Sequence, residues 1–310
     1  MATLSEALTA YRICAQAEGK SPKTIRWITT SVSYFSDFLG PDRQDIDELT
    51  GNDLRYFIID LQQKPKFLNH PYNNPQQENI SAQSIETYAR GIRAFFSYLY
   101  REELIKNNPM QKVKMPKVPK ITVPTFSQKE IETLISQPDK KTDTGFRDYA
   151  LLLAFIDSDS RLSEMAFLEE DDVDLENGYL KVMGKGGKER YLPIGYKVAR
   201  ALLKYKMKHR PVPVGTHRFW LTFDGRPLEP GKIEKIISNY GKKAGLKRCY
   251  PHKLRHTGSV LYLRNGGDVF SLQKKPGHTS LQMTRHYANL ADSDVKAKHM
   301  KYGVADRLKG

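Results

Sequence analysis

The sequence predicts a mainly α-helical protein with one small antiparallel β-sheet, an α+β fold, and three observations support this class. Apolar residues recur every three to four positions along most of the chain, which is the period of amphipathic helices. Strand-like segments flank a glycine-rich turn at 184–187, a pattern typical of a β-hairpin. Thirty-nine per cent of the 310 residues are hydrophobic, enough to form cores in one large or two modest domains.

Four helices are expected before residue 106. Ser21 and Ser81 each precede a helical pattern and are typical N-caps, and Thr3 or Ser5 would cap the first helix. The aromatic residues of the fourth pattern recur at helical spacing, which predicts that they are buried in a core. The expected helices span about residues 2–17, 22–39, 50–62 and 82–100, with a Pro-, Asn- and Gln-rich loop at 64–81.

A basic, proline-rich segment at 107–124 separates these helices from the rest of the chain. It contains four prolines and four lysines and has no helical period. Such a composition favours an extended, semi-rigid connector. We therefore expect an N-terminal helical domain at 1–106, a linker at 107–124 and a larger domain at 125–310.

The larger domain is expected to surround its hairpin with helices. Ser127 and Glu130 form a capping box before a first helix, and 146–155 is apolar enough for a buried helix. An Asn-Gly turn before the hairpin predicts a sheet of about three strands. The expected strands are 178–183 and 189–194, and the further expected helices are 198–208, 233–244, 252–262, 269–274 and a last one that holds Tyr287.

The charge is strongly basic and unevenly distributed. The net charge is +15, of which residues 1–120, with 16 Lys+Arg and 13 Asp+Glu, hold +3 and the remainder +12. Such a surplus favours a nucleic-acid partner or an anionic membrane surface. No apolar run of about 18 residues predicts a membrane span. The start does not resemble a signal peptide, and two cysteines make no disulfide framework or zinc cluster, so a cytoplasmic location is expected.

Cationic side chains, imidazoles and a phenol are concentrated between residues 252 and 287. His252 and Arg255 are three apart, so they share one face of the expected helix. Arginine donates two parallel hydrogen bonds to phosphate oxygens, which makes a phosphodiester the natural ligand. With two cations from upstream, the candidate catalytic set is Arg161, Lys185, His252, Arg255, His278 and Tyr287.

Each member of this set also has an ordinary structural interpretation. Arg161 pairs with Glu164 in one alternative, and Lys185 is a simple turn lysine. His252 caps its helix, His278 bonds a loop carbonyl and Tyr287 is a core or surface tyrosine in the others. The complete set in this order is far more specific than any single member. An acidic run at 169–174 has no metal-loop spacing and is interpreted as a solvated helix end, so no metal site is expected.

Four motifs resemble those of the tyrosine recombinases of the phage-integrase and Xer-like family. They are RLSEMAFLEEDDVDL, VMGKGGKERYLPI, PHKLRHT and GHTSLQMTRHY. The resemblance covers the domain after the linker and extends more loosely to the N-terminal helices. It implies a SAM-like helical core-binding domain followed by a tyrosine-recombinase catalytic domain.

The resemblance also implies roles for the six residues. Arg161 and Arg255 would hold the scissile phosphate. Tyr287 would attack phosphorus to form a 3′-phosphotyrosyl link, and Lys185 would protonate the departing 5′ oxygen. His252 would act as a proton acceptor or orienting group. His278 would donate a hydrogen bond to the phosphate. Neither ATP nor a metal is expected, because one phosphoester replaces another and the cations supply positive charge.

The implied partner is a double-stranded DNA recombination site, held by a homotetramer assembled on the DNA. Basic residues of the helical domain and linker are the candidate DNA contacts, with a solvated surface as the alternative for each. These candidates are Lys20, Lys23, Arg26, Arg90, Arg93, Lys117 and Lys120.

The expected function is site-specific DNA recombination by the integrase of a mobile element. The alternatives are an Xer-like resolvase of chromosome dimers, a catalytically weakened DNA-binding relative and a DNA-relaxing topoisomerase. The chain departs from the family at Ser158-Asp159-Ser160, Gly258-Ser259 and Lys275-Pro276. A carboxylate near Arg161 would weaken anion binding if it points inward, and proline limits a helix. We therefore expect a core that is locally loosened or re-surfaced and a slower reaction of the same type.

Overall fold

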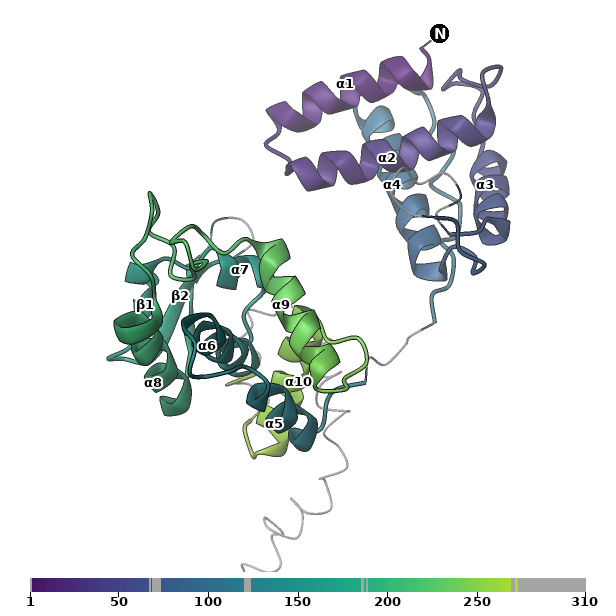
Figure 1. The fold of residues 1–310 in the computed structure, drawn as a ribbon. Helices are drawn as coiled ribbons and strands as arrows, with labels where there is room; N and C mark the ends of the chain where they lie inside the picture. Colours follow the sequence, from purple (N-terminus) through teal and green to yellow (C-terminus); the bar gives the residue numbers. More distant parts are fainter. Residues whose placement is uncertain are drawn as a thin grey trace, which may run out of the picture. The chain divides into compact units, whose positions relative to one another are not determined.

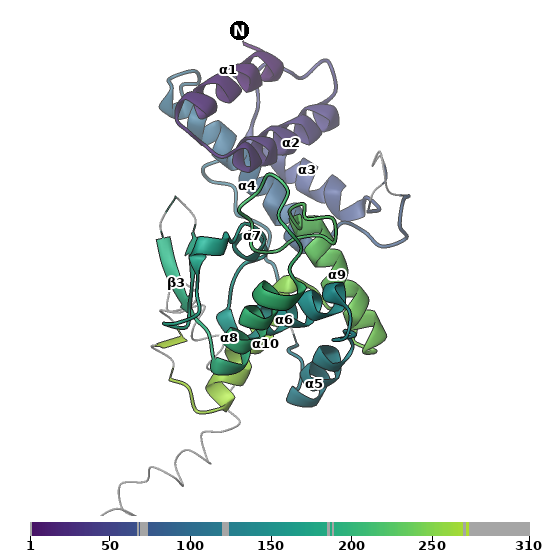
Figure 2. The same ribbon diagram turned by 60° about the vertical axis from the view of Figure 1, so that its left-hand side comes forward.

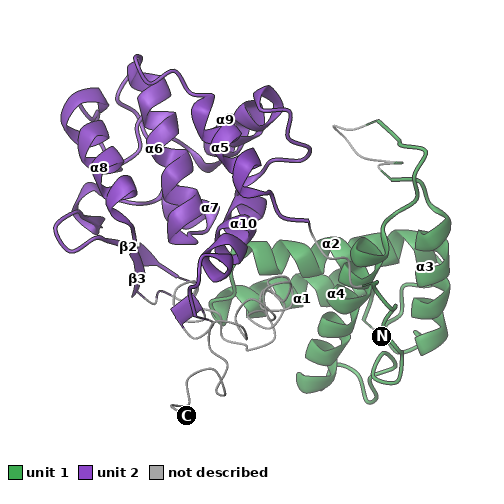
Figure 3. Ribbon diagram, turned by 90° about the horizontal axis from the view of Figure 1, so that it is seen from below, with its two compact units in different colours: residues 1–122 green, residues 123–310 purple. Residues whose placement is uncertain are grey.

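The protein is mainly helical with one three-stranded antiparallel sheet, as the sequence predicts (Figure 1). The chain divides into two compact units, residues 1–122 and residues 123–310 (Figure 3). No helix within the described part of the chain is both long and apolar enough to cross a membrane. The structure, a computed structural model, describes residues 2–66, 68, 74–119, 124–184, 187, 189–268 and 271–272.

Four helices make up unit 1, and their starts follow the expected capping residues. The side chain of Thr3, rather than Ser5, accepts the backbone N–H of Glu6 and completes a capping box. The hydroxyls of Ser21 and Ser81 cap the second and fourth helices by accepting the backbone N–H of Thr24 and Ser84, without a capping box. The helices are α1 (Leu4–Ala17), α2 (Pro22–Leu39), α3 (Gly51–Gln63) and α4 (Ala82–Arg101).

The core of unit 1 is rich in aromatic side chains, which confirms the interpretation of their helical spacing. Phe95 and Phe96 of α4 are fully buried. Phe35 of α2 packs edge-on against Phe57 of α3, with ring centroids 5.4 Å apart. Tyr11 brings α1 to the same core through an edge contact with Phe95. Helices α2 and α4 form the most extensive contact in this unit.

The segment expected as a linker starts inside unit 1. Met110 is fully buried and Val113 is 2% exposed, and both belong to the core of this unit. Arg93 of α4 donates a hydrogen bond to the backbone carbonyl of Val113. The chain through Val113 is therefore part of the helical unit, later than the predicted boundary at residue 106, because apolar side chains between the prolines find a core to enter.

Unit 2 combines several helices with one small sheet, which lies at one side of the unit (Figure 1). Strands β1 (Val173–Asp174), β2 (Tyr179–Met183) and β3 (Glu189–Pro193) are antiparallel in that order, with β3 at an edge (Figure 2). The expected hairpin joins β2 to β3. The helices are α5 (Gln128–Ser136), α6 (Asp143–Ser158), α7 (Leu162–Ala166), the 3₁₀ turn η1 (Glu170–Asp172), α8 (Tyr196–Lys204), the π-helical turn η2 (Tyr205–His209), α9 (Pro230–Lys243) and α10 (Pro251–Arg264).

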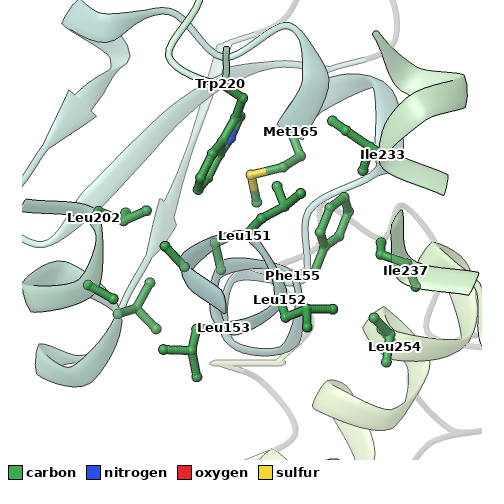
Figure 4. Close-up of a cluster of buried hydrophobic side chains, with 14 of the residues drawn as sticks. Leu151, Leu152, Leu153, Phe155, Met165, Leu202, Trp220, Ile233, Ile237 and Leu254 are labelled. Atoms are coloured by element: carbon green, nitrogen blue, oxygen red, sulfur yellow. The ribbon is translucent and has the colours of Figure 1, made fainter. Parts of the chain in front are cut away.

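Helix α6 lies at the centre of the core of unit 2. Leu151, Leu152 and Phe155 are fully buried, and side chains from the surrounding elements enclose them (Figure 4). Helices α5, α8 and α10 all pack on α6. Trp220, from the irregular segment after η2, enters the same core and stacks on Tyr205 with ring centroids 5.2 Å apart. A helix enclosed in this way is a rigid base for the residues that follow it.

Shortening Leu152 to alanine is expected to lower the free energy of unfolding by about 2–5 kcal/mol, because a fully buried leucine leaves a cavity. Thermal or urea unfolding of the full chain measures the change. The matched control is Leu203→Ala on α8, where the side chain is 49% exposed and the expected loss is under about 1 kcal/mol. Equal losses in the two variants would contradict the placement of α6 at the centre of the core.

Candidate active site

Arg161 enters the site directly after the central helix. Helix α6 ends at Ser158, and two buried residues connect it to Arg161, the N-cap of α7. The backbone N–H and one guanidinium nitrogen of Arg161 donate to the two carboxylate oxygens of Glu164, each at 2.7 Å. The pairing considered from the sequence is therefore present. The arginine side chain is nevertheless 44% exposed and lines a pocket.

Glu164 links this arginine to the sheet. Its side chain is 3% exposed and also accepts a hydrogen bond from the guanidinium of Arg190 on β3. Burial alone would raise the pKa of Glu164, but the hydrogen bonds from Arg161 and Arg190 outweigh it and hold the pKa below its usual value. Arg190 is not among the residues predicted for the site from the sequence. Its only signal is its place in the hairpin motif GKGGKER.

The start of α10 supplies the other two described members of the candidate set. Pro251 occupies the first turn of the helix, and His252 and Arg255 follow on one face, as their spacing predicts. Arg255 is 4% exposed, whereas His252 is exposed at the rim. Both line the same pocket as Arg161. The pocket is completed by Ser160, Leu162, Glu234, Tyr250 and Pro251.

Burial and two nearby cations together lower the pKa of the histidine in this pocket. Partial burial, followed by the charges of Arg255 and Arg161, lowers the pKa of His252 below its ordinary value. The imidazole is therefore neutral at pH 7 and can accept a proton. Burial also lowers the pKa of Arg255, but a guanidinium remains charged in proteins. The pocket thus combines two guanidinium groups, a neutral base and one carboxylate, that of Glu234, in its wall. The two guanidinium groups suit a bound phosphate.

Three of the six candidate catalytic residues lie outside the described residues: Lys185, His278 and Tyr287. The turn that carries Lys185 is bounded by described residues. The N–H of Gly187 donates to the carbonyl of Gly184 at 3.3 Å, and Gly187 adopts a positive φ of 72° that favours glycine. The structure therefore brings Arg161, His252 and Arg255 together, from segments about ninety residues apart in the chain.

Two of the candidate DNA-contact residues line a groove in unit 1. Lys23 and Arg26 are exposed on α2 and form no ion pair with any residue that the structure describes. The groove runs between α2 and α4, and its other walls include Trp27, Gln83 and Thr87. Hydroxyl, amide and cationic groups on one exposed groove are typical of a surface that contacts a phosphate backbone.

The other candidate DNA-contact residues differ in whether they already bond to a group of the protein. Arg93 donates a hydrogen bond to the carbonyl of Val113. Arg90 lies 3.6 Å from Glu86, and Lys20 pairs with Glu18. Lys117 is exposed, and Lys120 lies outside the described residues.

Two of the three family departures are tightly packed rather than loosened. All five of their residues are buried, and the hydroxyl of Ser259 donates to a carboxylate oxygen of Asp159 at 3.0 Å. The expectation of a loosened core is wrong at these two places, because the added carboxylate has a donor on the facing helix. The third departure, Lys275-Pro276, lies outside the described residues.

The acidic run after α7 serves an ordinary structural purpose. The two carboxylate oxygens of Glu170 pair with Lys206 at 2.9 Å and Arg210 at 3.0 Å. These ion pairs link η1 to η2 and to Arg210, the C-cap of η2. Both carboxylate oxygens of Glu170, which could otherwise bind a metal, are bonded to these cations.

Comparison with known proteins decides the family. The family model described as "Phage integrase family" matches residues 124–294. The chain belongs to the phage integrase family. This is a family of tyrosine recombinases, enzymes that cleave and rejoin DNA, so the resemblance found in the sequence is confirmed.

Relatives of the phage integrase family match over most of their length. The chain is 31% identical to "Tyrosine recombinase XerC" of Pelotomaculum thermopropionicum, over 76% of this chain and 80% of that protein. It is 29% identical to "Tyrosine recombinase XerD" of Staphylococcus aureus, over 90% of this chain and 96% of that protein. A lambda integrase dimer bound to a COC′ core site has the same fold, with a TM-score of 0.69 and 18% identity over 92% of this chain and 95% of that one.

Replacing Glu164 with glutamine is expected to lower the free energy of unfolding by about 1–3 kcal/mol at neutral pH, because two arginines lose a buried charged acceptor. The folded pKa of Glu164 lies below its ordinary value of 4.5, so its contribution is present above that pH and is lost as the pH falls through the folded pKa. The difference between the two proteins should therefore shrink below about pH 4.5. Thermal unfolding across pH measures it.

The control for this prediction is Glu176→Gln, which removes the same charge from an exposed turn. Its effect should be small at every pH. A Glu164→Gln variant that parallels this control from pH 7 to pH 4 would contradict the role given to the buried carboxylate.

Proposed function

We propose that this protein is a site-specific DNA recombinase that cleaves duplex DNA through a phosphotyrosyl link on Tyr287. The observation that supports this most directly is the pocket in which Arg161, His252 and Arg255 meet. They come from separate segments, and their spacing in the sequence matches the family motifs.

The two arginines would bind the non-bridging oxygens of the scissile phosphate. Each guanidinium can donate two parallel hydrogen bonds, and both cations are fixed before the DNA arrives. Arg161 is held by Glu164, and Arg255 is buried in α10. Charge that develops on phosphorus in the transition state meets donors already in place, which lowers the barrier without reorganisation.

Proton transfers would accompany the attack of Tyr287. Its phenolic oxygen forms a bond to phosphorus as the bond to the 5′ oxygen breaks, and a 3′-phosphotyrosyl link results. His252, neutral at pH 7, would accept or orient the phenolic proton. Lys185 would protonate the departing 5′ oxygen, and His278 would donate to the phosphate. Because one phosphoester replaces another, rejoining needs no external energy source.

The proposed partner is duplex DNA, and the assembly is four copies of the chain on two recombination sites. Net charge of +15 supports an extended contact with phosphates. The structure of a lambda integrase dimer bound to a COC′ core site supports the same partner for this fold. The groove of unit 1 that Lys23 and Arg26 line is the proposed backbone contact.

Substituting both Lys23 and Arg26 with alanine is expected to weaken DNA binding roughly tenfold and to reduce the slope of log affinity against log salt by about two. The loss should be similar for different DNA sequences, because phosphate contacts carry no sequence information. Fluorescence anisotropy of labelled duplexes at several salt concentrations measures both quantities.

A charge-matched control distinguishes the loss of this surface from a general loss of positive charge. Lys64 lies 2.7 Å from Asp60 and Arg101 lies 3.1 Å from Glu18, so both cations are already paired within unit 1. The Lys64→Ala/Arg101→Ala variant should keep most of the salt slope. Equal losses in the two double variants would contradict the groove as the contact surface.

Mobile-element integration is the role that we propose within this reaction, and resolution of chromosome dimers is the alternative. The names XerC and XerD of the relatives support the alternative. The two roles differ in their DNA site. A mobile element is cut at its own ends, which flank the gene, whereas a resolvase acts on a chromosomal site.

Replacing Tyr287 with phenylalanine is expected to abolish a covalent protein–DNA adduct, because the phenolic oxygen that bonds phosphorus is removed. Nicked suicide duplexes trap the adduct, since the short strand that carries the 5′ oxygen diffuses away. One duplex is drawn from the DNA that flanks the gene and one carries a chromosomal dimer-resolution site. Denaturing electrophoresis detects the adduct, and the duplex that yields it identifies the role.

Arg161→Ala and Arg255→Ala provide the second arm of this experiment and should each reduce adduct formation by about 100-fold or more. Binding of either duplex with no adduct from the unsubstituted chain would contradict the recombinase proposal and identify a DNA-binding relative without catalysis. An adduct that persists in Tyr287→Phe would contradict the assignment of the nucleophile.

A further inference from the structure

Two residues, Asp159 and Ser160, connect helix α6 to Arg161, and the aspartate places a carboxylate in the protein interior. Asp159 follows the last residue of the helix, is 1% exposed and adopts the left-handed conformation at φ 55°. Aspartate is among the few residues other than glycine that enter this region readily. Its carboxylate is therefore held inside the protein, two residues before one of the two pocket arginines.

Helix α10 crosses this connection at very short range. A Cβ atom placed on Gly258 would lie 2.1 Å from the backbone carbonyl oxygen of Ile156, in the last turn of α6. No real Cβ contact is that short, so the two backbones touch only because residue 258 is glycine. The distance between α6 and α10 is thus fixed at one point by direct backbone contact.

A buried hydrogen bond fixes the same crossing in a second way. The residue after Gly258 is Ser259, which is fully buried and donates to Asp159 at 3.0 Å. Ser259 lies four residues after Arg255, so the two side chains project from one face of α10, a turn apart. The bond therefore joins the residue that leads to Arg161 with the helix turn next to Arg255.

Charge supports the same arrangement. The carboxylate of Asp159 acts favourably on the guanidinium of Arg255, which is itself buried and repelled by Arg161. A hydrogen bond to a charged group in a buried setting is stronger than one between neutral groups. Asp159 thus stabilises the buried charge of Arg255 and, through Ser259, contacts the helix that carries it.

We propose that Asp159 and Ser259 form a positioning pair that sets the place of Arg255 relative to Arg161. This inference rests on the proposed function, because it concerns the phosphate site that the two arginines would form. Asp159 touches no substrate atom in this account; it acts through Ser259 and α10. Asp159 and Ser259 belong to two departures from the family that lie far apart in the sequence, and in the folded chain they are joined by one hydrogen bond.

The test measures the affinity of the full-length chain for inorganic phosphate by calorimetry, below the lowest unfolding temperature of the variants. Ser259→Ala removes only the hydroxyl and is expected to weaken phosphate binding about tenfold, because the buried carboxylate of Asp159 loses the donor that joins it to α10, and α10 shifts. Ser158→Ala is the matched control. Its hydroxyl is equally buried but bonds Ala154 within α6, so phosphate affinity should stay within about twofold.

A double variant separates positioning from a loss of stability. Asp159→Gly combined with Ser259→Ala removes both partners, and glycine adopts the left-handed conformation without strain. The two single variants, Asp159→Gly and Ser259→Ala, are measured beside it. If the two residues act as one pair, the double variant should lose about as much phosphate affinity as the more damaging single variant, because either single variant already breaks the bond between them. The melting temperatures of the three variants, measured in parallel, show whether the loss of affinity follows a loss of stability. Two outcomes overturn the positioning pair. One is a Ser259→Ala variant that binds phosphate as tightly as Ser158→Ala, and the other is a double variant whose loss of binding free energy equals the sum of the losses in Asp159→Gly and Ser259→Ala.

Failure of the proposed function gives a different result. Arg161→Ala and Arg255→Ala must each weaken phosphate binding for the pocket to be the phosphate site. If neither does, the phosphate site is wrong and the positioning pair falls with it. If both do and Ser259→Ala does not, only the positioning pair is overturned.

Discussion

The buried carboxylate of Glu164 is the interaction on which the pocket depends. A carboxylate that is 3% exposed is costly unless charged donors surround it, and here Arg161 and Arg190 supply them. The same bonds hold the start of α7 against β3. One acidic side chain therefore fixes an arginine of the pocket and the strand that leads away from the lysine-bearing turn.

The end of helix α6 holds one wall of the pocket in place. Helix α6 is enclosed by neighbours, so its end has little freedom, and Arg161 follows after two buried residues. Helix α10 is pinned to that end by the close approach at Gly258. Groups that must stabilise a transition state gain most when they are fixed before the substrate binds, and both arginines meet this condition.

Local sequence patterns predicted the elements and part of the site, whereas contacts between distant segments could not be predicted. Helical spacing, capping residues and the glycine-rich turn predicted the helices and the hairpin, and the His252–Arg255 spacing predicted one face of α10. The Arg190–Glu164 bond and the Asp159–Ser259 bond join residues 26 and 100 positions apart, and no local pattern marks them. For that reason the hydrogen-bond partner of Asp159 could not be predicted, and a core that is tightly packed around Ser158, Asp159, Ser160, Gly258 and Ser259 was expected to be loose.

The packing of Met110 and Val113 has a consequence for exchanging units between members of this family. A chimaera joined at residue 106 would take both side chains away from the core to which they belong and would leave Arg93 facing a foreign carbonyl. The exchanged piece has to carry the chain through Val113. The functional border of the helical unit is then set by where its last apolar side chain is buried, and not by where its last helix ends.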